Sequence, residues 1–153
     1  MRRVEKEIVD PAVIDEIMEK ATVCHIAMCD GDEPYVVPMS FGYADRTVYL
    51  HCAREGRKID VLQRNPRVCF AAHIDESLIR GGRPCSWSLG YRSVVGIGTG
   101  VIVTDPSEKG KGLDLIMRHY DGDPGPGYPR EALGSVCVIR VAVDTMTGKQ
   151  SGT

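Results

Sequence analysis

Residues 35–58 read YVVPMSFGYADRTVYLHCAREGRK, and this stretch gives the clearest indication of the fold. Residues 35–43 and 47–53 are rich in β-branched and aromatic side chains, which favour strands. Residues 44–46 between them have the length of a tight turn, so the two strands are predicted to be antiparallel neighbours. Residues 55–65 then change to helical spacing. The stretch therefore predicts a β-hairpin that runs directly into a short helix.

The rest of the chain adds further strands and helices on both sides of this hairpin. The remaining predicted strands are 22–29, 67–74, 91–104 and 135–143, the remaining helices 10–20 and 105–120, the loops 77–90 and 122–128, and the polar tail 146–153. Six strands joined mostly by hairpins, with three short helices, predict a mainly β fold, either an antiparallel barrel or a sandwich. The strands do not alternate regularly with helices, which disfavours a doubly wound parallel sheet.

The composition is that of an ordinary globular domain. The chain has 153 residues, 42% hydrophobic and 26% charged, with a net charge of −2. We therefore expect a single domain over residues 1–153. Because the chain carries no excess of basic residues to attract phosphates, we also expect no binding to nucleic acid. No apolar run approaches the ~20 residues of a membrane-spanning helix, and residues 1–10 lack the apolar core of a signal peptide. We expect a cytoplasmic protein with no membrane association.

The cysteines and histidines are scattered along the chain. The cysteines are Cys24, Cys29, Cys52, Cys69, Cys85 and Cys137, and the histidines are His25, His51, His73 and His119. They include no CxxC and no pair at metal-ligand spacing, so we predict mostly buried free thiols and no metal site. No Ser/His/Asp arrangement or carboxylate pair stands out either, and no catalytic residue is assigned. Any activity is therefore expected to come from a cofactor.

Two short motifs were considered as ligand sites. Gly96-Ile97-Gly98-Thr99-Gly100 resembles a dinucleotide fingerprint, but a strand continues after it where a helix is required. These glycines are interpreted as bends or close backbone approaches. Arg57 and Lys58 lie at the predicted start of a helix, where free backbone N–H groups and the helix dipole favour an anion. They predict a phosphate site, and the alternative is a solvated basic turn. His51 ends the preceding strand and is predicted to contact the same ligand.

Several segments, in this order, resemble the pyridoxamine 5′-phosphate oxidase-like flavin-binding superfamily. The segments are 35–43 (YVVPMSFGY), 48–53 (VYLHCA), 55–58 (EGRK), 65–70 (NPRVCF), 84–87 (PCSW), 91–98 (YRSVVGIG) and 147–149 (TGK). The branch that includes 5-nitroimidazole resistance proteins is the most similar. The resemblance covers almost the whole chain and implies a homodimer of six-stranded antiparallel split β-barrels, with FMN in a cleft between the subunits.

The resemblance also implies roles for particular residues. Pro38, Met39 and Ser40 would lay their backbone against the isoalloxazine ring, His51, Cys52 and Ala53 would line the ring and the ribityl chain, and Arg57 and Lys58 would hold the phosphate. Trp87, Tyr91, Arg92 and Ser93 would approach from the other subunit or close the site. Among these residues, His51 and Tyr91 are the candidates for a general acid.

The implied function is an FMN-dependent oxidoreductase that passes electrons or hydride to a small acceptor of the nitro or quinone class. The alternatives are a flavin or haem carrier without turnover and a purely structural dimer. Haem or a deazaflavin replaces FMN in other relatives. The additional basic residues that bind the substrate phosphate in pyridoxamine phosphate oxidase itself are not found here, which disfavours vitamin B6 oxidation.

Overall fold

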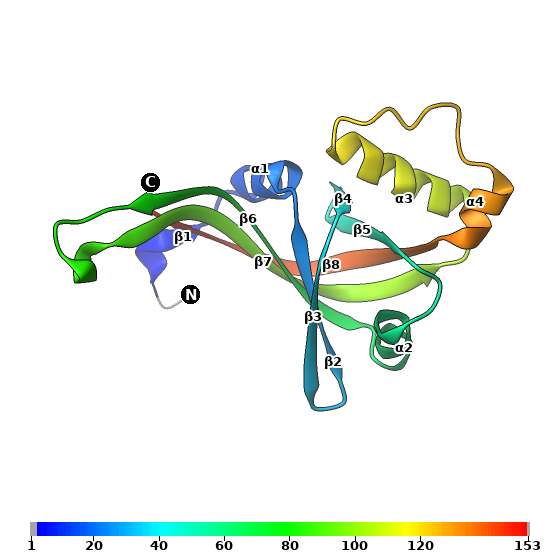
Figure 1. The fold of residues 1–153 in the computed structure, drawn as a ribbon, viewed down its shortest axis with the longest axis horizontal. Coiled ribbons are helices and arrows are strands. Elements are labelled where there is room, and N and C mark those ends of the chain that lie inside the picture. The colour runs from blue at the N-terminus through cyan, green and yellow to red at the C-terminus, as the bar shows by residue number, and fades with distance from the viewer. Residues whose placement is uncertain (1–2, 153) are drawn as a thin grey trace.

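The computed structural model describes residues 3–152, and a large antiparallel β-sheet forms its framework (Figure 1). The strands are β1 (Glu7–Ile8), β2 (Cys24–Asp30), β3 (Glu33–Met39), β4 (Phe41–Ala44), β5 (Thr47–Cys52), β6 (Arg67–Ile79), β7 (Ser88–Val103) and β8 (Cys137–Ser151). The helices are α1 (Pro11–Lys20), α2 (Arg57–Arg64), α3 (Pro106–His119) and α4 (Arg130–Ser135), with short 3-10 turns at Val4–Lys6 and Pro84–Ser86. The predicted mainly β, antiparallel fold with short helices is confirmed.

The order of the strands explains how the sheet becomes a split barrel. The strands pair in the order β3-β2-β6-β7-β8-β5-β4, and β1 is attached to β8. β3 and β4 stand at opposite ends of this order, yet only Ser40 separates them in the chain. The sheet must therefore curve until its two ends meet at Ser40. This curvature places β3 and the end of β5 beside α2, where the phosphate site is predicted.

The predicted number of strands was wrong, because the described residues form eight strands where six were expected. The predicted strand 35–43 is divided at Ser40, since β3 pairs with β2 whereas β4 pairs with β5. One straight strand cannot reach both partners at opposite ends of the sheet. The two-residue strand β1 supplies the other additional strand by pairing with Gly148 and Lys149 of β8.

Two segments predicted to be irregular are strands. β6 and β7 extend into the predicted loop 77–90, and only its central part, around Pro84–Ser86, is not paired. The predicted polar tail 146–153 is wrong as far as Ser151, because β8 continues through it alongside β7. Residue 153 lies outside the described residues. Both segments are at least partly solvent-exposed, so backbone pairing holds them and no regular apolar alternation marks them in the sequence.

The hydrophobic core lies between the concave side of the sheet and the helices that cover it. Asp10 caps α1 by accepting a hydrogen bond from the Ala12 N–H, and α1 buries Ile17 and Met18 completely. α3 covers β4 so closely that a Cβ on Gly42 would lie 2.7 Å from the α3 backbone at Ile116. None of the described helices combines the length and the apolar character that a bilayer crossing requires.

The interpretation of the glycines in β7 as close approaches is confirmed. A Cβ at Gly96 would overlap the buried Phe70 ring, and one at Gly98 would overlap the Ala142 carbonyl oxygen. Gly98 also lies where the register between β7 and β8 shifts, which bends the strand. These glycines therefore shape the sheet by allowing close packing and a bend.

The convex side of the sheet carries two rows of directly opposed residues across β3, β2, β6 and β7. We call it the outer face. One row is Val36, Ala27, Cys69 and Ile97, and the other is Pro38, His25, Ala71 and Val95. Val36 is 59%, Val95 45% and Ile97 44% exposed. Apolar side chains in adjacent rows at this exposure form a patch that is unusual for the surface of a monomer.

Candidate functional site

The start of α2 is built as an open helix N-terminus. Gly56 precedes it with φ of +123°, a backbone conformation that favours glycine, and no side chain caps the helix there. The N–H groups of Ile59 and Asp60 both bond to the Gly56 carbonyl oxygen. Within residues 3–152, the N–H groups of Arg57 and Lys58 have no such acceptor. They are therefore available, together with the positive end of the helix dipole, to an anion.

A cavity of about 200 Å³ opens at this helix start. Its lining comes from β3, from the end of β5 and from the first turn of α2: Tyr35, Cys52, Ala53, Glu55, Gly56, Arg57, Lys58 and Ile59. Met39 adjoins it, because Lys58 Nζ lies 3.2 Å from Met39 Sδ. The structure thus brings together five of the residues predicted from the sequence, namely Met39, Cys52, Ala53, Arg57 and Lys58. We call this cavity with Met39 the α2 pocket.

The two cations of the α2 pocket have different partners. The Arg57 guanidinium lies 2.9 Å from a Glu33 oxygen and 3.5 Å from an Asp30 oxygen, and it stacks 4.7 Å above the Tyr35 ring centre. The hydrogen bond to Glu33 is the main cause that raises the pKa of Arg57. Lys58 forms no ion pair within the described residues and contacts only a weak sulfur acceptor. It is the cation that is more available to a ligand.

The sequence analysis missed Tyr35, Asp30 and Glu33 as neighbours of Arg57. Tyr35 could have been found, because Tyr35, Val37 and Met39 alternate onto one face of β3. Asp30 ends β2 and Glu33 begins β3, on either side of the tight turn that joins these strands. Their approach to α2 depends on long-range packing between β2 and α2.

Three predicted residues lie close to the α2 pocket without lining it. Pro38 and Ser40 are solvent-exposed beside Met39, at the point where the chain leaves β3 for β4. His51 is exposed and lies on the opposite face of β5 from Cys52, since successive residues of a strand face opposite sides. These residues border the surface from which a ligand would approach.

The remaining predicted residues lie elsewhere on the chain. Trp87, Tyr91, Arg92 and Ser93 belong to the β6–β7 hairpin, which extends away from α2 toward the opposite end of the molecule (Figure 1). Trp87 is 50% exposed, and its indole N–H donates to the Gly81 carbonyl oxygen at 2.9 Å. Within one chain, the structure does not bring these four residues together with the α2 pocket.

The three β7 residues of this group have partners in their own chain. Arg92 lies 2.9 Å from a Glu16 oxygen and 2.6 Å from an Asp75 oxygen. Lys149 Nζ stands 5.6 Å from the Tyr91 ring centre, and the Ser93 hydroxyl donates to the Lys149 carbonyl oxygen at 3.4 Å. Arg92 therefore links α1 to the β6–β7 hairpin.

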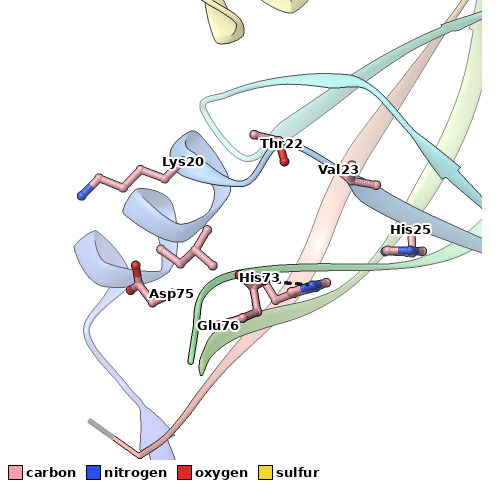
Figure 2. A pocket seen from close by; sticks show the side chains of 8 residues that line it. Lys20, Thr22, Val23, His25, His73, Asp75 and Glu76 are labelled. Atoms are coloured by element: carbon pink, nitrogen blue, oxygen red, sulfur yellow. Dashed lines mark ion pairs between the residues drawn. The ribbon is translucent and has the colours of Figure 1, made fainter. Parts of the chain in front are cut away.

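A second, larger cavity of about 540 Å³ lies beside β2 and β6 (Figure 2). His25 and His73 lie side by side in it, with ring centres 6.2 Å apart, and His73 pairs with Glu76 at 3.0 Å. His25 is also the cross-strand partner of Pro38. The sequence analysis missed this pair because the two histidines meet only through the pairing of β2 with β6. Within residues 3–152, no three His, Cys, Asp or Glu side chains form a group suited to a metal ion.

Comparisons with known proteins agree with this architecture. A family model described as pyridoxamine 5′-phosphate oxidase matches residues 10–150. A search of the curated proteins finds no match. The solved structure of a candidate 5-nitroimidazole antibiotic resistance protein from Bacteroides thetaiotaomicron is 40% identical, with a TM-score of 0.84, over 94% of this chain and 86% of that chain.

More distant structures share the fold. An FAD and haem binding protein from Mycobacterium smegmatis is 17% identical with a TM-score of 0.85, over 97% of this chain and 74% of that one. The flavocytochrome Anf3 from Azotobacter vinelandii is 18% identical with a TM-score of 0.83, over 100% of this chain and 72% of that one. The resemblance inferred from the sequence motifs is confirmed by the family match, and this chain belongs to the pyridoxamine 5′-phosphate oxidase family.

Proposed function

We propose that this protein is a cytoplasmic, homodimeric flavoprotein that binds FMN and passes electrons or hydride to a small acceptor of the nitro or quinone class. The observation that carries the proposal is the α2 pocket. It joins an uncapped helix N-terminus to two adjacent cations at a cavity beside the strand ends. The family match and the solved structures named for FAD binding support a flavin as the ligand.

The residues of the α2 pocket fit a phosphate group. Lys58 would supply an unpaired ammonium, Arg57 a planar guanidinium, and the first turn of α2 its free N–H groups. Lys58 also contacts Met39, so the pocket is continuous with the β3 end and Ser40, where the ring system would lie on the backbone. Bound FMN would supply the redox chemistry, and the protein's part is to hold and orient it and to limit access of water and oxygen.

The distribution of the predicted residues supports the proposal of a homodimer. The outer face leaves Val36, Val95 and Ile97 exposed, and a second copy of the chain would cover them. Such a copy could also bring the β6–β7 hairpin, with Trp87 and Tyr91, to the other chain's α2 pocket. The site would then be complete only in the dimer.

A binding experiment with matched variants tests the proposal. FMN is titrated into the purified protein, and binding is followed by the quenching of flavin fluorescence. Each charged phosphate contact is worth roughly 1.5–3 kcal/mol, so Arg57→Ala with Lys58→Ala should raise the Kd by a factor of about one hundred or more. Lys111→Ala removes an exposed cation of α3, outside the α2 pocket, and should leave the Kd nearly unchanged. Equal affinity in the wild type and the double variant would refute the assignment.

A second experiment separates an enzyme from a carrier. The bound FMN is reduced chemically without oxygen and mixed with menadione or a nitroaromatic compound. Reoxidation faster than that of free reduced FMN would support an oxidoreductase. Reoxidation at the same rate or slower would indicate a carrier, and a protein that takes up haem but no flavin would overturn the choice of cofactor.

A further inference from the structure

Two of the six cysteines stand directly opposite one another in the sheet. Cys52 is the last residue of β5 and Cys137 is the first residue of β8, and the antiparallel register pairs them. Directly opposed residues of antiparallel strands have Cα atoms about 4.5 or 5.5 Å apart, depending on the type of pair. Both values lie within the range of about 4.4–6.8 Å that disulfides span, so the backbone of this pair is already placed for a covalent link.

The two side chains also point to the same side of the sheet. Residues paired across antiparallel strands share a face, and the neighbouring inward pair is Leu50 with Ile139, both buried. Cys137 is buried with them, and Cys52 packs against the same core. Bond formation therefore needs rotation of side chains and no change of register.

No other cysteine of the described residues has this arrangement. Cys24 is paired with Met39, Cys29 with Pro34, and Cys69 with Ala27 and Ile97, while Cys85 lies in the 3-10 turn at the hairpin tip. All six are free thiols. The prediction that most of them are buried holds only for Cys24 and Cys137.

Each cysteine of this pair borders a cavity. Cys52 is half-buried and lines the α2 pocket, and Cys137 lines a separate cavity of about 270 Å³ together with Arg54 and Gln63. Burial chiefly, and the neighbouring Cys137 thiol in addition, raise the pKa of Cys52, whereas the Lys58 charge lowers it. Cys52 is therefore a thiol at neutral pH, and its oxidation is expected to be slow without a strong oxidant.

We propose that Cys52 and Cys137 form a redox-active pair that hydrogen peroxide converts into an intramolecular disulfide. The Cys52 thiolate attacks one peroxide oxygen, the O–O bond breaks, and sulfenic acid and water form. The Cys137 sulfur then attacks the Cys52 sulfur, the S–O bond breaks, and a second water leaves. Two thiols and one peroxide thus give one disulfide and two waters, and a dithiol reverses the reaction by exchange.

The disulfide would covalently join the last residue pair in the β5–β8 register. Cys52 is followed at once by residues 53–56, the segment that leads into α2. A covalent bond there prevents fraying of the ladder at the edge of the α2 pocket. It also closes a long chain loop in the unfolded state, so the oxidised protein should melt at least ~5 °C higher than the reduced protein. The assignment does not depend on which cofactor the protein binds.

Peptide mapping of the full-length protein tests the proposal. The reduced wild type is treated with hydrogen peroxide, the remaining thiols are alkylated, and the protein is digested without reductant. A peptide joining Cys52 to Cys137, with four thiols still alkylated and the link removed by dithiothreitol, is the expected result. Because the mapping uses the wild type, the outcome does not depend on the folding of any variant.

Two variants sharpen the result. Cys69 is half-buried and has no cysteine opposite it in the sheet, so Cys69→Ser should leave the Cys52–Cys137 link unchanged. Cys137→Ser should abolish the link and let oxidised Cys52 accumulate as sulfinic acid. Sulfinic acid at Cys52 in the wild type without any link to Cys137, or a link from Cys52 to another cysteine, would overturn the proposal.

Discussion

At the scale of single residues, the ion-pair partners of Arg57 affect anion binding at the α2 pocket as much as its charge does. Glu33 and Asp30 already hold the guanidinium, so an anion at the α2 pocket competes with two carboxylates. The position of Arg57 and Lys58 at the start of α2 could be predicted from the sequence, since a cationic pair at a helix start is a local pattern. The competing acids could not, because they reach Arg57 only once the β2–β3 turn packs against α2.

Removing one competitor gives a prediction for ligand affinity. Glu33→Gln should tighten FMN binding by about two- to fivefold at low salt, because exposed ion pairs are worth about 0.2–1 kcal/mol. Asp32→Asn is the control, since Asp32 lies in the same turn and forms no ion pair within the described residues. Fluorescence titrations at two salt concentrations measure the effect. Weaker binding in Glu33→Gln would show that Glu33 positions Arg57 for the ligand and does not compete with it.

Glu16 gives a second residue-scale prediction, for pH. Hydrogen bonds from Arg92 and then from Lys20 lower the pKa of Glu16 from 4.5 to about 2. A carboxyl with a depressed folded-state pKa adds stability above its unfolded pKa and loses it as the pH falls toward the folded value. Glu16→Gln should therefore lower the free energy of unfolding at pH 7 and flatten its decline between about pH 4.5 and 2. Urea denaturation across that range, with Glu19→Gln as control, measures this difference, and identical pH profiles would contradict it.

At the scale of elements, the β6–β7 hairpin is the part that sequence patterns described least well. The segment 77–90 was predicted to be a loop, yet pairs such as Leu78 with Leu89 continue the ladder beyond the bulge at Ile74. The antiparallel class itself was predictable, because turn residues and strand propensities are local. The length of the hairpin was not, because its outer part is stabilised by backbone pairing and buries little apolar surface.

Trp87 near the tip of this hairpin provides an optical test of where the hairpin lies in the assembled protein. It is half-exposed and is the only tryptophan of the chain. If the hairpin of one subunit reaches the flavin of the other, bound FMN should quench most of the indole emission, in proportion to occupancy. Emission is recorded while FMN is titrated into the flavin-free protein. Constant emission during demonstrated binding would place Trp87 away from the cofactor.

At the scale of the whole molecule, the outer face predicts the state of association. Its two rows of apolar residues lie on four neighbouring strands, and a stable twofold interface of about 2,000 Å² or more would cover them. We expect a dimer at micromolar concentration by sedimentation velocity. Ile97→Glu places a charge in one row and should give a monomer, whereas Thr99→Glu, further along β7, should not. A wild-type monomer at that concentration would contradict the prediction.

The position of β8 has a consequence for how the protein is made. Among the described strands, β8 comes after all the others in the chain, yet it lies between β7 and β5 and also pairs with β1. Until the ribosome has released β8, the β4–β5 hairpin has no partner strand that connects it to the rest of the sheet. A nascent chain therefore exposes an unpaired edge on β5 once β5 has left the ribosome, and a second on β7 once β7 has followed, until β8 is released. Chaperones that shield such edges would have most effect on this chain during synthesis, and the sheet can be completed only after β8 is available.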